Sequence, residues 1–426
     1  MTSDSCGKRI ALLFWEGHLG IAPSLIAGIE ALATRGYRVD VVLRKPVGGC
    51  APPPPFDERR VHVIAMRRLR AAADDAVRAR SHAATRIHLL PHRVVRRICE
   101  HLDRIRFHVL CRRLALRERH CAVIGVDDDG IVVAGPIAAR HGIPLLLWSL
   151  ELDPLAGSAD PVRRLVRWLA RRYRRKVAVT IVQDEVRAHA LEVLTGGSGA
   201  VVRLVPNAPA GPVVQQRGRY FHERFHLRPE QLVVLHAGAI IPEMLAEEVA
   251  EAAATWPEGW SLVLHERERR YPESPFVRRV QAAGRGRVLL SLEPVPYRDL
   301  DVVFASADVC LVLYSDRHGD NFRLVSRASG KLAHALRVGV PVVCSDLPGL
   351  AAVIEEYGCG VVVRSVGEIE DAVLRILASR DQYRARAWVC YREAFEFGGS
   401  FSMVLDDLDR LTESGQLTSP SSASCP

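Results

Sequence analysis

Short apolar runs alternate with longer segments of mixed polarity along most of this chain. Residues 122–126 and 144–148, for example, consist of apolar residues only. Continuous apolar runs of this length indicate strands that are buried on both faces, as in a parallel sheet covered by helices. The segments between them are long enough for a helix, which predicts βαβ units with right-handed crossovers.

This alternation occurs in two series, separated by residues 210–231, which have little apolar periodicity and are the predicted linker. A chain of 426 residues is also too long for one ordinary core. We therefore predict an α/β protein with two doubly wound parallel-sheet domains, 1–212 and 213–411, that face a cleft, followed by a disordered tail at 412–426. The predicted strands are 9–15, 39–43, 61–64, 122–126, 144–148, 179–182 and 202–205 in the first domain, and 233–236, 261–265, 288–290, 309–313, 341–344 and 360–363 in the second.

One helix start in the second series has the features of an anion site. Ser329 is a favourable N-cap residue, and Gly330 leaves the backbone open to close approach. Lys331 adds a positive charge where the helix dipole is already positive, so a phosphate is the expected partner. The helix is predicted to end at Gly339, before a buried strand. Ligands of such sheets bind at the carboxyl ends of the strands, and a cleft between two domains is a favoured place.

The charge of the chain favours anionic partners. The net charge is +9, and only four of the 58 basic residues are lysines, so the retained Lys331 indicates that a compact point charge is needed there. Nucleoside diphosphates rank first among the expected partners, then anionic lipid headgroups; no nucleic acid is expected, because no basic stripe with interleaved aromatic residues occurs.

Two arginine-rich segments have two interpretations. Residues 67–120 are predicted as two or three amphipathic helices and residues 163–176 as one more. Their basic faces are either simply solvated or lie against an anionic membrane surface. The run Asp127-Asp128-Asp129 is predicted as a strand-to-helix turn with an Asp N-cap; binding of a divalent cation is the alternative.

Neither a membrane span nor a metal centre is expected. No stretch approaches the roughly 20 apolar residues that cross a bilayer, and the polar N-terminus does not have the pattern of a signal peptide. The ten cysteines are scattered singly, which indicates reduced thiols rather than disulfides or a zinc site. The expected location is cytoplasmic, with membrane association open.

Several of these motifs, in this order, resemble the nucleotide-sugar-dependent glycosyltransferases of the GT-B fold, which has two Rossmann-like domains. The strongest match is to the bacterial enzymes that build polysaccharides, lipid-linked glycans and glycosylated natural products. The matching segments are Ser329–Leu332 with Gly339–Val343 and Pro348–Leu350, supported by Ser306–Val309, Ile181–Asp184 and Val205–Asn207.

The resemblance implies a donor site in the second domain. Ser329, Gly330 and Lys331 would hold the donor diphosphate, and Gly238 would approach the phosphates. His334 stands where many members of the family have a ribose-binding glutamate, and it can still hydrogen-bond a ribose. Two further residues complete the implied donor site: Val295 beside the base and Asn321 beside the sugar.

The acceptor side is implied to lie in the first domain. Gly17 and His18 resemble the loop of inverting GT-B enzymes that use a histidine as general base, and an imidazole has a suitable pKa for removing a hydroxyl proton. His18 is therefore the predicted catalytic residue; acceptor binding and an ordinary loop histidine are the alternatives. Glu151, at the end of a strand, is either an acceptor-binding residue, like Gly17, or a capping or surface residue.

The implied activity is transfer of a hexose or amino sugar from a nucleoside-diphosphate sugar, such as a UDP-sugar, to a hydroxyl acceptor. The acceptor would be a small molecule, a natural product or a lipid-linked glycan. The charge of the leaving diphosphate would be stabilised by a helix N-terminus and Lys331, so that no metal and no other cofactor are needed. The alternatives are a sugar-nucleotide epimerase of the same fold and a non-catalytic binding protein.

Overall fold

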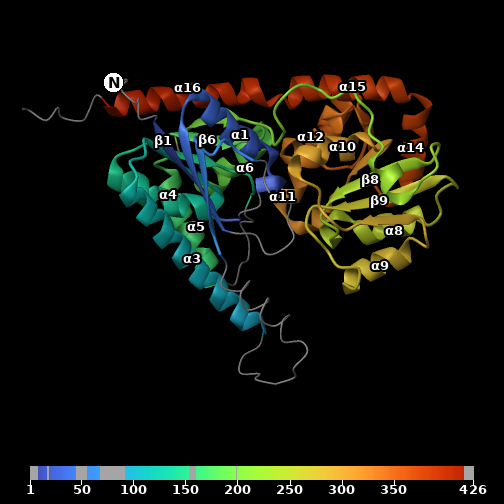
Figure 1. Ribbon diagram of the computed structural model, residues 1–426, viewed down its shortest axis with the longest axis horizontal. Coiled ribbons are helices and arrows are strands. Elements are labelled where there is room, and N and C mark those ends of the chain that lie inside the picture. The colour runs from blue at the N-terminus through green and yellow to red at the C-terminus, as the bar shows by residue number, and fades with distance from the viewer. Residues whose placement is uncertain are drawn as a thin grey trace, which may run out of the picture.

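The computed structural model describes residues 8–16, 19–44, 55–67, 92–152, 160–197 and 199–416. Two α/β domains lie side by side, each built around one parallel sheet (Figure 1). The predicted fold class is confirmed, and every strand predicted from an apolar run is present. Within the part of the chain that the structure describes, no helix is both long enough and apolar enough to cross a membrane.

The first domain has a seven-stranded sheet in the order β3-β2-β1-β4-β5-β6-β7, with all neighbours parallel. The direction of strand addition reverses between β1 and β4, which is where ligands of doubly wound sheets bind. The strands are β1 (Arg9–Phe14), β2 (Arg38–Arg44), β3 (Val61–Met66), β4 (Ala122–Val126), β5 (Leu145–Trp148), β6 (Val179–Val182) and β7 (Val201–Leu204).

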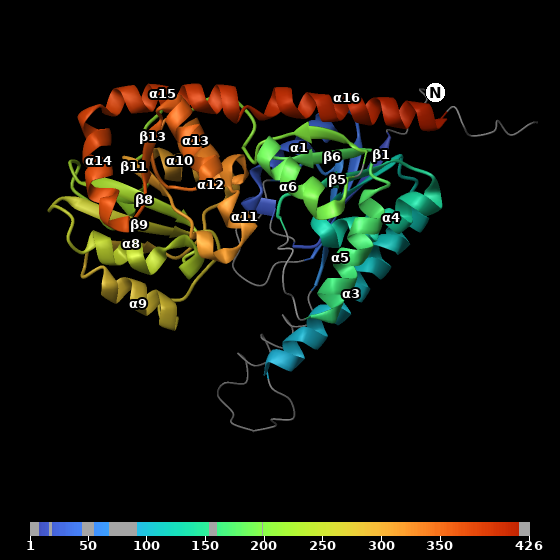
Figure 2. The same ribbon diagram turned by 180° about the vertical axis from the view of Figure 1, so that it is seen from behind.

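Helices cover both faces of this sheet. Helices α3 (His92–Arg117), α4 (Asp127–His141) and α5 (Pro161–Arg174) lie on one face, where Leu13 and Val123 contribute to the core. Helix α1 (Pro23–Arg35) lies on the other, and α6 (Glu185–Thr195) precedes the edge strand β7. Figure 2 shows the same layers from behind. Where two or three helices were predicted in residues 67–120, the described part contains the single long helix α3.

The second domain has a six-stranded parallel sheet in the order β10-β9-β8-β11-β12-β13. Its strands are β8 (Leu232–Gly238), β9 (Trp260–Glu266), β10 (Val288–Ser291), β11 (Val309–Val312), β12 (Val342–Ser345) and β13 (Gly360–Val363). Its helices are α7 (Tyr220–Phe225), α8 (Ala246–Ala253), α9 (Pro275–Ala283), α10 (Leu300–Ala305), α11 (Asp320–Arg323), α12 (Gly330–Arg337), α13 (Pro348–Tyr357), α14 (Ile369–Ala378) and α15 (Arg380–Ala394).

The predicted linker contains a structured element of the second domain. Helix α7 lies inside residues 210–231, and its Phe221 is fully buried in the core of the second domain. The helix has only six residues, too few for a periodic apolar pattern to be visible in the sequence. The connection between the domains is therefore shorter than predicted.

The last helix belongs structurally to the first domain. Helix α16 (Phe397–Gln416) follows α15, and the two run end to end along both domains (Figures 1 and 2). Phe401 of α16 stacks on Trp148 of β5 with ring centroids 5.3 Å apart. The predicted boundary at residue 411 therefore differs from the structure in two ways: the helix continues through 416, and it packs on the first domain.

Candidate active site

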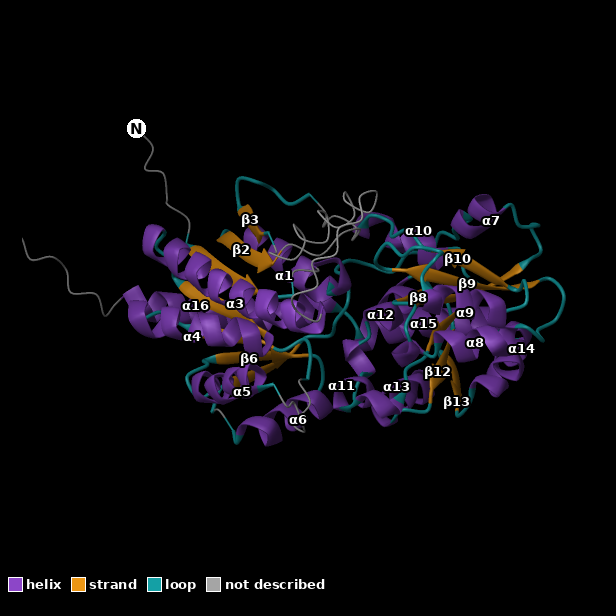
Figure 3. Ribbon diagram, turned by 90° about the horizontal axis from the view of Figure 1, so that it is seen from below, coloured by secondary structure: helices purple, strands orange, loops and turns teal. Residues whose placement is uncertain are grey.

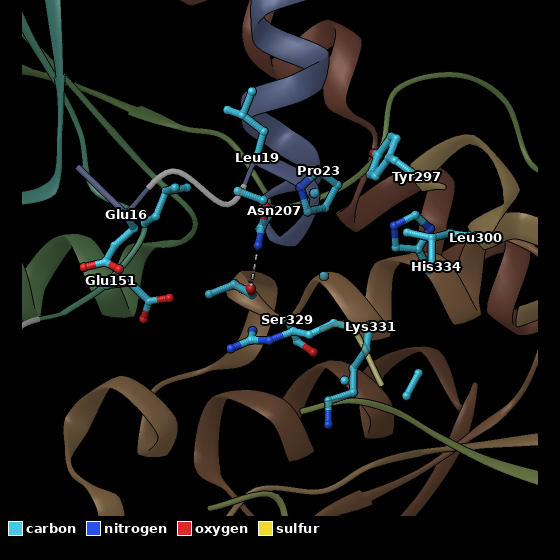
Figure 4. Close-up of a pocket in the computed structure, with 18 of the residues that line it drawn as sticks. Glu16, Leu19, Pro23, Glu151, Asn207, Tyr297, Leu300, Ser329, Lys331 and His334 are labelled. Atoms are coloured by element: carbon cyan, nitrogen blue, oxygen red, sulfur yellow. Dashed lines mark hydrogen bonds between the residues drawn. The ribbon is translucent and has the colours of Figure 1, made fainter. Parts of the chain in front are cut away.

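A cavity of about 580 Å³ lies between the carboxyl ends of the strands of both sheets. All the predicted site residues that the structure describes line it: Glu151 from the first domain and, from the second, Gly238, Val295, Asn321, Ser329, Gly330, Lys331 and His334. Figure 4 shows how several of them converge on the same space. Gly17 and His18 lie outside the described residues, so the assignment of His18 as the base stays a prediction.

The predicted helix start is present as α12. Ser329 caps it, because its Oγ accepts a hydrogen bond from the Leu332 amide (3.3 Å) and lies 2.7 Å from the Tyr314 hydroxyl. The first intrahelical bond runs from Ala333 N to Ser329 O (3.1 Å), so the amides before it have no partner within the helix. A Cβ on Gly330 would lie 3.3 Å from Pro23, which begins α1 of the first domain. The start of α12 therefore faces the opposite domain closely.

Lys331 is a cation without a carboxylate partner among the residues that the structure describes. Its Nζ lies 3.5 Å from Leu313 O, 3.4 Å from Met244 Sδ and 4.3 Å from the centroid of the Tyr314 ring. The pKa of Lys331 is lowered to about 7, mainly because burial disfavours the ammonium; the nearby Cys310 raises the pKa and the like charge of Arg267 lowers it. A buried ammonium in these surroundings is poised to gain an anionic ligand.

Two charged residues that the sequence analysis missed lie at the end of β9. Glu266 is fully buried and accepts hydrogen bonds from Ile240 N (2.8 Å) and Arg270 Nε (2.8 Å), which fixes the loop after Gly238. Gly238 has φ of 124°, which favours glycine. Arg267 follows and adds a second cation to the wall of the cavity. The charged run HERERR, which begins in the last two residues of β9, is the signal that the sequence offers.

His334 forms part of an aromatic wall. Its ring stacks on Phe304 with centroids 5.3 Å apart and meets Tyr297 edge-on at 5.9 Å. Its Nδ1 lies 3.4 Å from Asp301 Oδ1, and Arg337 contacts the other oxygen of that carboxylate at 3.0 Å. Burial raises the pKa of Asp301, but the hydrogen bond from His334 and the charges of His334 and Arg337 outweigh it and hold the pKa below its ordinary value. His334 and Arg337 thus share the Asp301 carboxylate behind the aromatic wall.

Asn321 contacts the first domain through both ends of its amide. Its Oδ1 accepts hydrogen bonds from Leu152 N (3.0 Å) and Arg187 Nη2 (3.0 Å), and its Nδ2 donates to the Glu151 carboxylate. Asn321 therefore lines the cavity as predicted, but its hydrogen bonds hold the domains together. Glu151 is engaged in the same contact and does not cap a helix.

Arg187 is the centre of this contact and was not identified from the sequence. The side chain is fully buried, and it donates to the carbonyl oxygens of Leu150 (2.8 Å), Asn321 (3.3 Å) and Leu324 (3.3 Å). Asp184 caps the helix that carries it, accepting from Arg187 N at 2.8 Å. One arginine among 54 carries no sequence signal for such a role.

Asn207 makes a second link between the domains. Its Oδ1 accepts from Ser24 Oγ (2.9 Å), at the start of α1, while its Nδ2 donates to Ala328 O (3.0 Å), just before Ser329. Its own amide donates to Arg327 O (2.9 Å). The segment between α11 and α12 is thus fixed by side chains of the first domain at both ends.

The acidic run at the end of β4 differs from the prediction. Asp127 is the first residue of α4 and not its cap; it has φ of 55° and accepts from Leu150 N (2.7 Å) and Glu151 N (3.0 Å). Its burial raises the pKa well above the ordinary value. Asp128 and Asp129 pair with Arg174 and Arg104. In the described ranges, no group of three or more His, Cys, Asp or Glu side chains is arranged to hold a metal ion.

Comparison with solved structures places the chain in a known fold. Sucrose-phosphate synthase from Thermosynechococcus elongatus has a TM-score of 0.69 at 16% identity over 96% of this chain and all of that one. Anabaena HepE, solved with UDP and glucose, has a TM-score of 0.64 at 13% identity, covering 94% of this chain and 99% of its own.

An α,α-trehalose-phosphate synthase (UDP-forming) from Burkholderia vietnamiensis has a TM-score of 0.59 at 12% identity, over 95% of this chain and all of that one. No family model matches the chain, and no curated protein sequence matches it. At these identities the likeness concerns the architecture, and with the two facing sheets it establishes that this chain has the GT-B fold of glycosyltransferases.

Proposed function

We propose that this protein is a glycosyltransferase that moves a hexose or amino sugar from a nucleoside-diphosphate sugar to a hydroxyl acceptor. The observation that carries the proposal is Lys331, a partly buried cation without a carboxylate partner among the described residues, at the capped start of α12 in the cavity between the domains. A diphosphate is the ligand that best matches a helix N-terminus next to a point charge.

The surrounding residues suggest how the donor lies. The diphosphate would face the amides at the start of α12, with Lys331 and Arg267 in the wall of the same cavity. The base and ribose would lie along the wall formed by Val295, Tyr297 and His334. That UDP is present in the structure of HepE, which shares the fold, agrees with a nucleoside-diphosphate donor.

The chemistry would then be mainly electrostatic. As the bond between the sugar and the diphosphate breaks, negative charge grows on the leaving group, and the α12 dipole and both cations stabilise it. Because a helix dipole and two cations can stabilise the charge of the leaving diphosphate, the proposed reaction needs no metal ion. The acceptor hydroxyl would approach from the first domain, where Glu16, Asp127 and Glu151 line the cavity. Removal of its proton is assigned to His18, as the sequence predicts.

Nucleotide binding tests the proposal directly. Thermal unfolding is followed with a panel of nucleoside diphosphates, and at least one of them is expected to raise the melting temperature. Lys331→Ala should abolish that shift, whereas Lys176→Ala, which removes an exposed lysine outside the cavity, should retain it. Absence of a shift with every nucleotide, or an unchanged shift in Lys331→Ala, would contradict the proposal.

Turnover separates the proposed activity from its alternatives. With a nucleotide sugar and an acceptor hydroxyl, nucleoside diphosphate and a glycoside should form, and a chelator should leave the rate unchanged. Isomerisation of the donor without an acceptor would indicate an epimerase instead. Tight nucleotide binding without any turnover would indicate a binding protein.

A further inference from the structure

Helix α3 is apolar on two opposite faces, and the residues that the structure describes cover only one of them. Phe107 and Cys111 on the inner face are buried in the core of the first domain. On the outer face, five large apolar side chains are each between 43% and 63% exposed: Ile98, Leu102, Ile105, Val109 and Leu116. Their spacing of three, four and seven residues places them in one stripe along about 27 Å of the helix.

Helix α5 extends this exposed surface. Its Leu165 and Trp168 are more than half exposed. Asp129 of α4 joins the two helices, because it pairs with Arg104 of α3 and lies 3.7 Å from Arg163 of α5. Figure 1 shows α3 and α5 on the outside of the first domain, and Figure 3, from below, shows α4 between them. A stripe of exposed apolar side chains as long as that on α3 marks an interaction surface.

The charge around the stripe is strongly positive. Helix α3 has eight arginines and two acidic residues, and α5 has six arginines and no acidic residue. Their combined formal charge is +12, whereas the whole chain carries +9, so the rest of the protein is slightly acidic. Arg106, Arg112 and Arg113 flank the apolar stripe of α3 and are exposed. Excess positive charge is thus concentrated on the same helices that expose the apolar side chains.

We propose that the outer faces of α3 and α5 dock on an anionic phospholipid surface. A stripe of aliphatic side chains with an exposed tryptophan, bordered by arginines, matches a bilayer interface, where apolar groups enter the acyl boundary and cations meet the headgroups. A second copy of this chain would bring the same exposed arginines against this face, so like charges would meet. The segment 68–91 is also net basic, so it does not provide the complementary charge either.

Nucleic acid fits the surface less well than lipid does. Binding to phosphate backbones relies on cations and polar side chains, and it gives no burial to an aliphatic stripe. The docking inference is independent of the proposed activity, because it rests on helices whose exposed faces do not line the cavity between the domains.

Vesicle co-sedimentation of the full chain tests the inference. The protein is expected to sediment with phosphatidylcholine vesicles that contain phosphatidylglycerol, and to remain in solution with phosphatidylcholine alone. Raising the salt concentration should weaken the binding. Ile105→Ser with Leu116→Ser should lower the partition coefficient roughly tenfold or more, as should Arg112→Glu with Arg113→Glu.

Matched variants on the other elements serve as controls. Leu374→Ser with Met403→Ser removes two apolar side chains of 48% and 44% exposure, and Arg375→Glu with Arg392→Glu reverses two exposed charges of the second domain. Both should bind vesicles like the wild type. Unchanged melting temperatures of all four variants show that the fold is retained.

Tryptophan fluorescence tests whether α5 itself contacts the vesicle. Tryptophan emission should shift to shorter wavelength when anionic vesicles are added, and Trp168→Phe should remove that shift without abolishing sedimentation. Absence of vesicle binding, or binding unaffected by the stripe and arginine variants, would overturn the inference. Self-association or nucleic-acid binding that the stripe variants abolish, without vesicle binding, would overturn it as well.

Discussion

Lys331 combines the properties of a phosphate ligand with those of a titrating group. Its pKa of about 7 lies far below the ordinary lysine value, because burial disfavours the ammonium and Arg267 adds a like charge. The contacts of its Nζ with Leu313 O and the Tyr314 ring favour the ammonium, but burial outweighs them. From the sequence, a retained lysine after Ser329 and Gly330 predicts the place of this cation but not its protonation.

Diphosphate binding should therefore take up a proton. A bound phosphate raises the pKa of Lys331. At a pH between the pKa of the free site and that of the bound site, Lys331 therefore takes up a proton when the diphosphate binds. The affinity for the diphosphate then falls as the pH rises above about 7. Calorimetric titration with a nucleoside diphosphate at a pH of about 8, in buffers of different ionisation enthalpy, should show uptake of most of one proton. Lys331→Arg, which stays charged, should show none. Equal uptake in both proteins would contradict this assignment.

At the scale of elements, features that depend on a local sequence pattern could be predicted, whereas features that depend on long-range contacts could not. The strands were predictable because each is a short, mostly apolar run, and α12 because its cap and its C-terminal Gly339 are local signals. Arg187 and Glu266 were not predictable, because their roles depend on which loops surround them after folding. The same holds for Asn321: its position was predicted, but its contacts with the first domain were not.

The segment between α11 and α12 should be sensitive to loss of the Asn321 amide. Asn321→Ala leaves Leu152 N and Arg187 Nη2 without this acceptor, which should cost about 1–3 kcal/mol of stability. Because the segment leads into Ser329, nucleoside-diphosphate affinity should fall as well, by severalfold. Urea unfolding and calorimetry measure both effects.

The neighbouring Asp320 provides the control for this effect. It pairs with Arg323 at the surface, so Asp320→Ala should cost about 0–1 kcal/mol and leave nucleotide affinity unchanged. If Asn321→Ala also left stability and affinity unchanged, the contact with Arg187 and Leu152 would not position the phosphate helix.

At the scale of the whole molecule, α16 ties the end of the chain to the first domain. It follows α15 of the second domain, so the chain crosses between the domains twice. Such a return was not predictable, because an amphipathic helix at the end of a sequence carries no mark of the sheet that it covers. Its apolar side faces α1 and β5, and the two domains around the cavity are thereby joined at the side opposite α3 (Figure 1).

The stability of the first domain should therefore depend on a residue near the C-terminus. Phe401 is 1% exposed; it stacks on Trp148 at 5.3 Å and on Phe397 at 5.0 Å. Phe401→Ala removes both contacts and leaves a cavity beside β5, which should cost about 3–5 kcal/mol. Met403→Ala on the exposed side of the same helix should change stability by less than about 0.5 kcal/mol. Urea unfolding followed by tryptophan fluorescence distinguishes the two, and equal small effects would show that α16 does not complete the core of the first domain.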